Sequence, residues 1–389
     1  MEVKRNIVIM NLAAALIWMS MYVYVPTLPA YAASIGANVV MIGIIGGSYG
    51  VMQIVLRWPL GAVSDKIGKD RLMMITGFAI LVVSCLLFVL QNDNVYMVVF
   101  ARGVAGAAAA WWVVISASYA KYNSEDKQVK AQGVINASAS IGKFAAAALC
   151  SVVAQFFGYH ATFVASLVVA VIGMALMFGL KEVKPKKEVA VPSMKEQFLL
   201  VKNKHLLAFS ALGILSQFLC FSTANTFTPV AAEALGADNV QLGLIILVFF
   251  IVTAISAFFV GTKPYKAMGA RNALAISFAI GALSCLPALY HINMAWLYFG
   301  QVLSGVCYGI TQGITAGLVI RCVPPAQRGG ATGFFQSAYA VGILAGPVIM
   351  GYVIDRSGFD AAYWMMLALM GVAVLLSYIV VPRQYDKMT

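Results

Sequence analysis

The chain has 389 residues, of which 62% are hydrophobic and 10% are charged, and its mean hydropathy is +0.88. A soluble domain of this length does not have such a composition, whereas a membrane protein with many spanning helices does. The formal net charge of +12 alone would suit nucleic-acid binding, but the basic residues are distributed otherwise, as shown below. The charged segment Met1–Arg5 leads into an apolar stretch of spanning length, so we expect no cleavable signal peptide.

Twelve apolar segments follow one another along the chain, each bounded by charged residues or by glycine and proline. Segments of this length cross a bilayer as helices. We therefore predict an all-α membrane protein with twelve transmembrane helices in two pseudo-symmetric six-helix bundles. The expected spans are 7–32, 40–63, 72–91, 95–120, 129–156, 161–180, 205–233, 240–261, 272–290, 294–320, 329–353 and 361–381.

The longest polar interval, residues 181–204, carries seven lysines near the middle of the chain. We interpret it as a cytoplasmic linker between an N-terminal bundle (1–180) and a C-terminal bundle (205–389). A cytoplasmic N-terminus places 22 of the 26 basic residues on the cytoplasmic side, as the positive-inside rule requires. The positive charge is then a topology signal and does not imply nucleic acid. We expect a multi-pass protein of the cytoplasmic (inner) membrane, with both termini in the cytoplasm and a monomeric chain.

The two halves repeat each other at a shift of 200 residues. The tripeptide at 78–80 recurs at 278–280, and the tripeptide at 84–86 recurs at 284–286. Glycines match as well, including Gly36 with Gly236 and Gly142 with Gly342. Parallel six-helix repeats with a site between them are a transporter architecture.

Lys143 lies in the middle of the fifth span, about 13 residues or roughly 20 Å of helix from either end. A lysine stem is too short to reach the surface from there. A helix-centre lysine costs about 2.5–3.5 kcal/mol on insertion scales. Asn136, Ser140 and Lys143 share one face of this helix. A water-filled cavity, a neighbouring helix or a ligand must meet that face.

The acidic residues offer no partner for a charge inside the membrane, because all fourteen fall in expected loops or at expected helix ends. The membrane interior then contains three cations, Arg57, Arg102 and Lys143, and no acidic partner. Buried charges require partners. A mobile anion is the simplest partner, although water or a deprotonated Lys143 would also serve. Arg57 and Arg102 are equally well explained as structural residues at a helix end or against backbone carbonyls.

Two motifs connect the chain with a known family. The segment GAVSDKIGKDR at 61–71 resembles the cytoplasmic signature of the major facilitator superfamily, and RGVAG at 102–106 is similar to its second motif. The resemblance implies alternating access between two bundles. It also implies a latch in which Asp65 faces the positive N-terminal end of a helix that begins near Arg328. We therefore expect a gating group, although a charged loop that obeys the positive-inside rule also fits; the group comprises Gly61, Asp65, Lys66, Gly68 and Arg71.

The fifth span departs from one pattern of this family. Drug/proton antiporters usually carry Gly-x-x-x-Gly-Pro there, whereas this chain has GKFAAA from Gly142 onwards. The intact pattern stands in the eleventh span, from Gly342 to Pro347. The departure weakens an antiporter reading and puts Lys143 within a packing motif.

These observations favour a secondary active transporter that moves a small organic anion or zwitterionic metabolite by alternating access. A proton-coupled multidrug efflux antiporter is the first alternative, and a non-transporting sensor or lipid-handling protein is the second. No phosphate loop, metal cluster or nucleophile group indicates an enzyme, and we expect no cofactor. A coupling proton or a counter-substrate is a possible further partner. Polar and aromatic side chains on the helices expected to line the cavity are further candidates for substrate binding, although each of them alone is equally well explained by helix packing. The full set of candidates is Lys143, Asn136, Ser140, Arg57, Arg102, Trp112, Tyr22, Gln53, Gln217, Tyr308, Gln312, Gln336 and Tyr339.

Overall fold

The computed structural model describes residues 2–67, 69–122, 128–181, 199–260, 262–290, 293–324 and 327–385. Every regular element in these ranges is helical. The first half contains α1 (Glu2–Tyr22), η1 (Val25–Thr27), α2 (Leu28–Ser34), α3 (Val39–Ile67), α4 (Asp70–Val89), α5 (Val95–Ala110), α6 (Trp112–Lys121), α7 (Gln128–Phe157) and α8 (Tyr159–Met177). The second half contains η3 (Leu200–Lys202), α10 (Lys204–Ser222), η4 (Thr223–Phe227), α11 (Thr228–Ala234), α12 (Asn239–Phe259), α13 (Lys263–Met268), α14 (Ala270–Leu283), α15 (Leu286–Leu289), α16 (Met294–Arg321), α17 (Arg328–Val380) and η6 (Arg383–Tyr385).

Eleven helical stretches in the described ranges are long and apolar enough to cross a membrane. One of them, α17, has 53 residues and contains Gly358 with φ 83° and ψ 170°, which is not a helical conformation. Gly358 therefore divides α17 into two spans, and the total becomes twelve, as the sequence predicts. Gly158 separates α7 from α8 in the first half with a similar φ of 78°.

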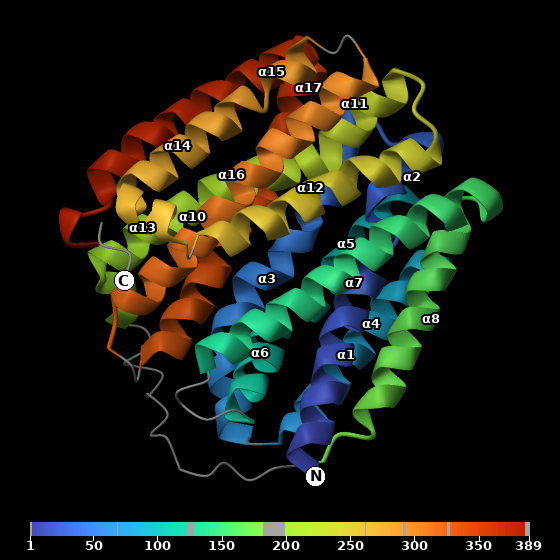
Figure 1. Ribbon diagram of the computed structural model, residues 1–389. Coiled ribbons are helices and arrows are strands. Elements are labelled where there is room, and N and C mark those ends of the chain that lie inside the picture. The colour runs from blue at the N-terminus through green and yellow to red at the C-terminus, as the bar shows by residue number, and fades with distance from the viewer. Residues whose placement is uncertain are drawn as a thin grey trace.

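The two halves lie side by side, and their helices correspond (Figure 1). The blue-to-green helices of the first half form one bundle, and the yellow-to-red helices of the second half form the other. Gly142 of α7 packs so closely on α1 that a Cβ would overlap the carbonyl oxygen of Ala15. Gly342 of α17 packs in the same way on the carbonyl oxygen of Ile214 in α10. The repeat in the sequence is thus a repeat of helix packing.

The halves meet at two symmetry-related pairs of helices, α3 with α17 and α7 with α12. Gly43 of α3 abuts the carbonyl of Pro347, and Gly243 of α12 abuts α7 at Ser151. Near the same end of α7, the Asn239 side chain donates a hydrogen bond of 3.2 Å to the carbonyl of Ala154. These contacts close the end of the bundle opposite to the N-terminus of α1.

Candidate functional site

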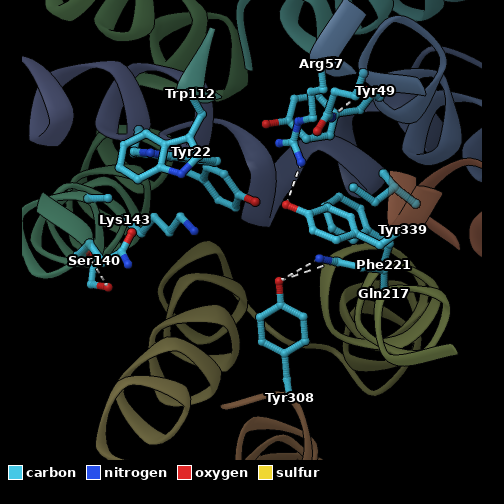
Figure 2. A pocket seen from close by; sticks show the side chains of 15 residues that line it. Tyr22, Tyr49, Arg57, Trp112, Ser140, Lys143, Gln217, Phe221, Tyr308 and Tyr339 are labelled. Carbon is cyan, nitrogen blue, oxygen red and sulfur yellow. Dashed lines mark hydrogen bonds between the residues drawn. The ribbon is translucent and has the colours of Figure 1, made fainter. Parts of the chain in front are cut away.

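A cavity of about 220 Å³ lies between the two halves. Its lining comes from α1, α3, α6 and α7 on one side and from α10, α16 and α17 on the other (Figure 2). The lining residues are Trp18, Tyr22, Tyr49, Gln53, Arg57, Trp112, Asn136, Ala139, Ser140, Lys143, Gln217, Phe221, Tyr308, Tyr339 and Ile343. Two of these fifteen side chains are cationic, and in the described part of the chain none that lines the cavity is acidic.

Lys143 reaches the cavity from α7 and lies against aromatic rings. Its Nζ atom is 4.1 Å from the ring centroid of Trp18, 5.3 Å from that of Tyr22 and 5.5 Å from that of Phe250. The position follows from Gly142, because the close approach of α7 to α1 brings residue 143 beside the aromatic face of α1. Ring faces attract cations, so they stabilise the ammonium group without an anionic partner.

Arg57 reaches the cavity from α3, which belongs to the same half as α7, and is 3% exposed. Its Nη1 donates a hydrogen bond of 2.5 Å to the hydroxyl of Tyr339 on α17, so the bond crosses between the halves (Figure 2). The guanidinium also lies 5.1 Å from the centroid of the same ring. Beside it, Gln217 of α10 donates a hydrogen bond of 3.1 Å to the hydroxyl of Tyr308 on α16.

Stacked aromatic rings cover the cavity towards the closed end. The rings of Tyr49 and Phe221, one from each half, have centroids 5.9 Å apart and an interplanar angle of 19°. Arg102 lies behind Tyr49, with its guanidinium 4.2 Å from the Tyr49 ring centroid. Its Nη1 donates a hydrogen bond of 3.1 Å to the hydroxyl of Tyr24. Arg102 therefore supports the cover of the cavity from outside.

The chain matches the sequence model of the Major Facilitator Superfamily over residues 10–263 and 210–388. It belongs to this superfamily. The match covers most of the chain, and the twelve spans and the position of the cavity agree with it. The protein is accordingly a transporter of the Major Facilitator Superfamily.

Three similar proteins illustrate the breadth of the superfamily. The multi-drug resistance efflux pump PmrA of Streptococcus pneumoniae is 27% identical over 171 residues, and the match covers only 41% of either chain. A probable sugar efflux transporter of Pasteurella multocida is 24% identical over 372 residues, covering 94% of this chain and 89% of the other. The crystal structure of the nucleoside transporter NupG superposes with a TM-score of 0.76 at 18% identity and covers 98% of both chains. That last likeness concerns the fold.

The structure brings ten of the thirteen residues predicted for substrate binding to the cavity of this superfamily member. They are Lys143, Asn136, Ser140, Arg57, Trp112, Tyr22, Gln53, Gln217, Tyr308 and Tyr339. Arg102 lies behind Tyr49 instead, because the rings of Tyr24 and Tyr49 flank its guanidinium. Gln312 and Gln336 also lie outside the lining. The role of the ten in binding stays a prediction.

Five cavity residues were not among the predicted binding residues: Trp18, Tyr49, Ala139, Phe221 and Ile343. Trp18 precedes Tyr22 by one helical turn, so the sequence offered a signal for it on the same face of α1. Tyr49 precedes Gln53 and Arg57 by one and two turns, so a stripe on α3 was available to find it. Phe250 approaches Lys143 from α12, and nothing in the sequence connects these two residues.

Most of the predicted gating group, in the cytoplasmic motif of the superfamily, lies outside the residues that the structure describes. Gly68 lies outside the described residues, and so do the surroundings of Gly61 and the side chains of Asp65 and Lys66. The guanidinium of Arg71 lies 6.0 Å from the ring centroid of Phe178, at the end of α8. The partner helix, α17, begins at Arg328, where the latch requires it. The latch itself stays a prediction, as does the linker, because residues 182–198 lie outside the description as well.

Proposed function

We propose that this protein is a secondary active transporter that moves a small organic anion or zwitterion with an apolar or aromatic body. The observation that carries the proposal is the charge of the cavity: Lys143 and Arg57 line it, and no acidic side chain does in the described ranges. A carboxylate that enters between them gains two cationic partners in surroundings of low dielectric. The rings of Trp18, Tyr22 and Phe221 offer the apolar contact that orients the rest of a small molecule.

The two cations differ in their freedom to bind a substrate. Arg57 is already engaged by the hydroxyl of Tyr339 and is deeply buried. Lys143 is half-buried, and its contacts are ring faces, which a carboxylate supplements without displacing a hydrogen bond. We therefore assign the primary anion contact to Lys143 and an orienting contact to the pair of Arg57 and Tyr339.

We assign the arrangement to the inward-facing state of alternating access. The contacts of Gly43 with Pro347 and of Gly243 with Ser151 close one end. Towards the other end the lining changes from half-buried Lys143 to exposed Asn136 on the same helix. This end contains the N-terminus of α1, which the lysine and arginine distribution assigns to the cytoplasm. An anion would then enter or leave from the cytoplasm in this state.

Multidrug efflux is the second candidate function. The aromatic lining favours it, and so does the similarity to the pump PmrA over part of the chain. Two cations in the cavity oppose it, because they repel the lipophilic cations that such pumps commonly carry. The two functions therefore differ in the sign of the charge that the cavity accepts.

A panel of ligands added to the purified protein tests whether the cavity accepts negatively or positively charged molecules. The melting temperature is measured with aromatic carboxylates, amino acids, uncharged analogues of the same carboxylates, and lipophilic cations of similar size. Binding to the native state raises the melting temperature by mass action, and a concentration of 100 times the Kd contributes about 2.7 kcal/mol. We expect carboxylates or zwitterions to raise it and their uncharged amides to have little effect. Stabilisation by lipophilic cations alone would refute the anion proposal in favour of multidrug efflux.

A further inference from the structure

A second, much smaller void lies inside the second half, away from the substrate cavity. Its volume is about 10 Å³, close to the space that one water molecule needs. It lies among η4, α11, the end of α14, α15, α16 and the second span of α17. Six side chains with oxygen atoms line it: Thr223, Thr228, Ser284, Gln301, Ser304 and Tyr363.

Two of these oxygen atoms are buried without a partner. Gln301, Ser304 and Tyr363 are 2%, 3% and 1% exposed, and Gln301 Oε1 and Ser304 Oγ form no hydrogen bond. The Tyr363 hydroxyl lies beside the Thr228 side chain, also in the lining, without a hydrogen bond of regular geometry. A buried polar atom without a partner costs about 1–3 kcal/mol. Two such atoms around one void indicate that something binds them.

The first half shows that the fold does not require this polar void. Val23, Leu28 and Phe163 stand there at the places of Thr223, Thr228 and Tyr363. Each of the three apolar residues is replaced by one with a hydroxyl group in the second half.

Aromatic rings also fill the matching place in the first half. Tyr24 and Phe88 have ring centroids 4.5 Å apart, and Phe88 stacks on Phe163 at 5.1 Å. The second half has Ala224 and Ala288 at the places of Tyr24 and Phe88, so two rings are missing. The void is therefore a specific feature of the second half.

The helix of the first half that corresponds to α16 is α5, and it carries a charged residue where α16 carries a neutral one. Asn94 and Asn293 cap α5 and α16, and Gly106 and Gly305 approach the carbonyls of Tyr49 and Phe249, so the shift in this helix pair is 199 residues. Gln301 then stands at the place of Arg102. The first half has a covalently attached cation here, and the second half has an amide beside a void.

Irregular helices surround the void. Thr223 begins η4, a π-helical turn of five residues within the seventh span, and Thr228 follows it. Such turns are frequent at functional sites. Ser284 follows the end of α14, where the C-terminal helix dipole is negative. Pro287 has no amide hydrogen for the carbonyl of Leu283, four residues earlier. The void is rich in oxygen atoms, and it lies beside the negative end of a helix and beside interrupted helices. These features together suit a small cation and disfavour an anion.

A single water molecule is the simplest alternative occupant, because its two hydrogens and two lone pairs would pair with Gln301 Oε1, Ser304 Oγ and the Tyr363 hydroxyl. Thr223 and Ser284 already donate their hydroxyl hydrogens to the carbonyls of Leu219 and Gly281, and Gln301 Oε1 has no hydrogen to donate. Three of the six oxygen atoms thus offer only lone pairs to the void, and a water molecule with two hydrogens donates to no more than two of them. A cation binds all of them through their lone pairs.

We propose that this void is a binding site for a monovalent cation of the size of Na⁺, coordinated by the neutral oxygen atoms of the six lining residues. Hard cations prefer such oxygen ligands. The site is connected to the substrate cavity by two elements: Ser304 is one turn from Tyr308 on α16, and Thr223 follows Phe221 by two residues. A bound cation would order η4 and the part of α16 that carries Tyr308, and it would thereby couple to transport. This coupling role rests on the proposed transport function, whereas the existence of the binding site does not.

Melting temperature is the test, measured on the purified full chain in NaCl, KCl and choline chloride at equal ionic strength. Thr223→Val and Tyr363→Phe are the variants, because they install the residues that the first half carries at the same places. Thr162→Val is the matched control, since its hydroxyl bonds only to the carbonyl of Tyr159 within its own helix. No organic substrate is present, so the result is independent of whether the substrate is an anion.

We expect NaCl to raise the melting temperature of the wild type and of Thr162→Val along a saturating curve, above the values in choline chloride. In Thr223→Val and Tyr363→Phe the half-saturating Na⁺ concentration should increase on the order of tenfold or more, as with other lost contacts at metal sites. Equal curves in NaCl and choline chloride for the wild type would overturn the proposal and leave a water site. An unchanged half-saturating concentration in both variants would overturn it as well.

Discussion

The two contacts between the halves are related by the internal repeat, yet they are built differently. Along α3, Gly43, Gly47 and Gly50 bring the backbone against α17, and a Cβ on Gly50 would lie 2.7 Å from the amide nitrogen of Leu344. On α12, Gly243 has the same role near the closed end, but Leu247 and Phe250 stand at the places of Gly47 and Gly50. One contact is therefore close along its length, and the other is close only near one end.

Lys143 lies at the looser contact, and Arg57 lies at the close one. Lys143 of α7 faces the ring of Phe250, whereas its counterpart on α17 is Ile343, which is 2% exposed. One turn earlier, Ala139 of α7 corresponds to Tyr339 of α17, which accepts a hydrogen bond from Arg57. Each half thus supplies a different polar group to the same cavity. The repeat therefore sets the packing of the helices, and the deviations from the repeat set the chemistry of the cavity.

The largest effect is expected when α7 is made like α17, with Lys143→Ile. Binding of the carboxylates that stabilise the wild type should be abolished, because their main cationic partner is gone. The melting temperature without ligand should stay the same or increase, because a half-buried charge with an insertion cost of about 2.5–3.5 kcal/mol has been removed. Melting temperature, carboxylate affinity and pH-driven uptake are measured together, and Lys143→Arg should restore binding in part.

Other roles of Lys143 predict other combinations of these three measurements. A purely structural lysine predicts a lower melting temperature with unchanged affinity per folded molecule. A proton carrier predicts normal binding with loss of pH-driven uptake. Either pattern would contradict the assignment of Lys143 as the primary anion contact.

The second effect concerns the close contact itself. Gly50→Ala places a methyl group against backbone atoms of Leu344 and Ala340, which cannot rotate away. Overpacking of this kind costs about 1–3 kcal/mol. Gly133→Ala on α7 is the matched control, because a Cβ there meets nothing within 4 Å. Thermal unfolding should show a lower melting temperature for Gly50→Ala alone; equal values for both variants would show that α3 and α17 are not in close contact in the protein.

Much of this fold is predictable from the sequence, because hydrophobic length and charge bias define the spans without knowledge of neighbours. Even the boundary inside α17 is marked by Gly358, the counterpart of Gly158. The cavity is predictable where a polar residue stands on an apolar helix, as with Lys143 and Asn136. Tyr49 and Phe221 were not predicted, because an aromatic residue on a spanning helix is equally suited to lipid, core or cavity.

The partners of the charges could not be predicted. Sequence indicates that Lys143 and Arg102 lie in the membrane without acids, and a mobile anion then looks like the simplest partner. The structure places the ring of Trp18 against Lys143 and the ring of Tyr49 against Arg102. Ring contacts depend on how helices rotate against each other, which periodicity alone does not determine. The small void in the second half exists because two aromatic rings of the first half are missing there. Ala224 and Ala288 stand at the places of Tyr24 and Phe88.

A smaller effect is expected at the hydrogen bond that crosses the close contact. Tyr339→Phe removes the hydroxyl that holds Arg57, and water in the cavity replaces it in part. We expect a loss of carboxylate affinity corresponding to about 0.5–1.5 kcal/mol. Tyr308→Phe, which removes a bond to the uncharged Gln217, is the control and should have a weaker effect on carboxylates. Equal losses in the two variants would show that Arg57 does not orient the substrate.

The smallest effect is expected at Phe250, the residue that stands where the other contact has Gly50. Phe250→Leu keeps an apolar side chain but removes one of the rings beside Lys143. A contact between a cation and a ring contributes about 0.5–1 kcal/mol at exposed sites, so the melting temperature without ligand should decrease slightly. Carboxylate affinity should change little or increase, because the ammonium group loses a competing partner while Trp18, at 4.1 Å, remains. Isothermal titration with the best carboxylate of the panel measures this difference. A loss of binding as complete as in Lys143→Ile would mean that the substrate is bound chiefly by the ring of Phe250, and Lys143 would then not be the primary anion contact.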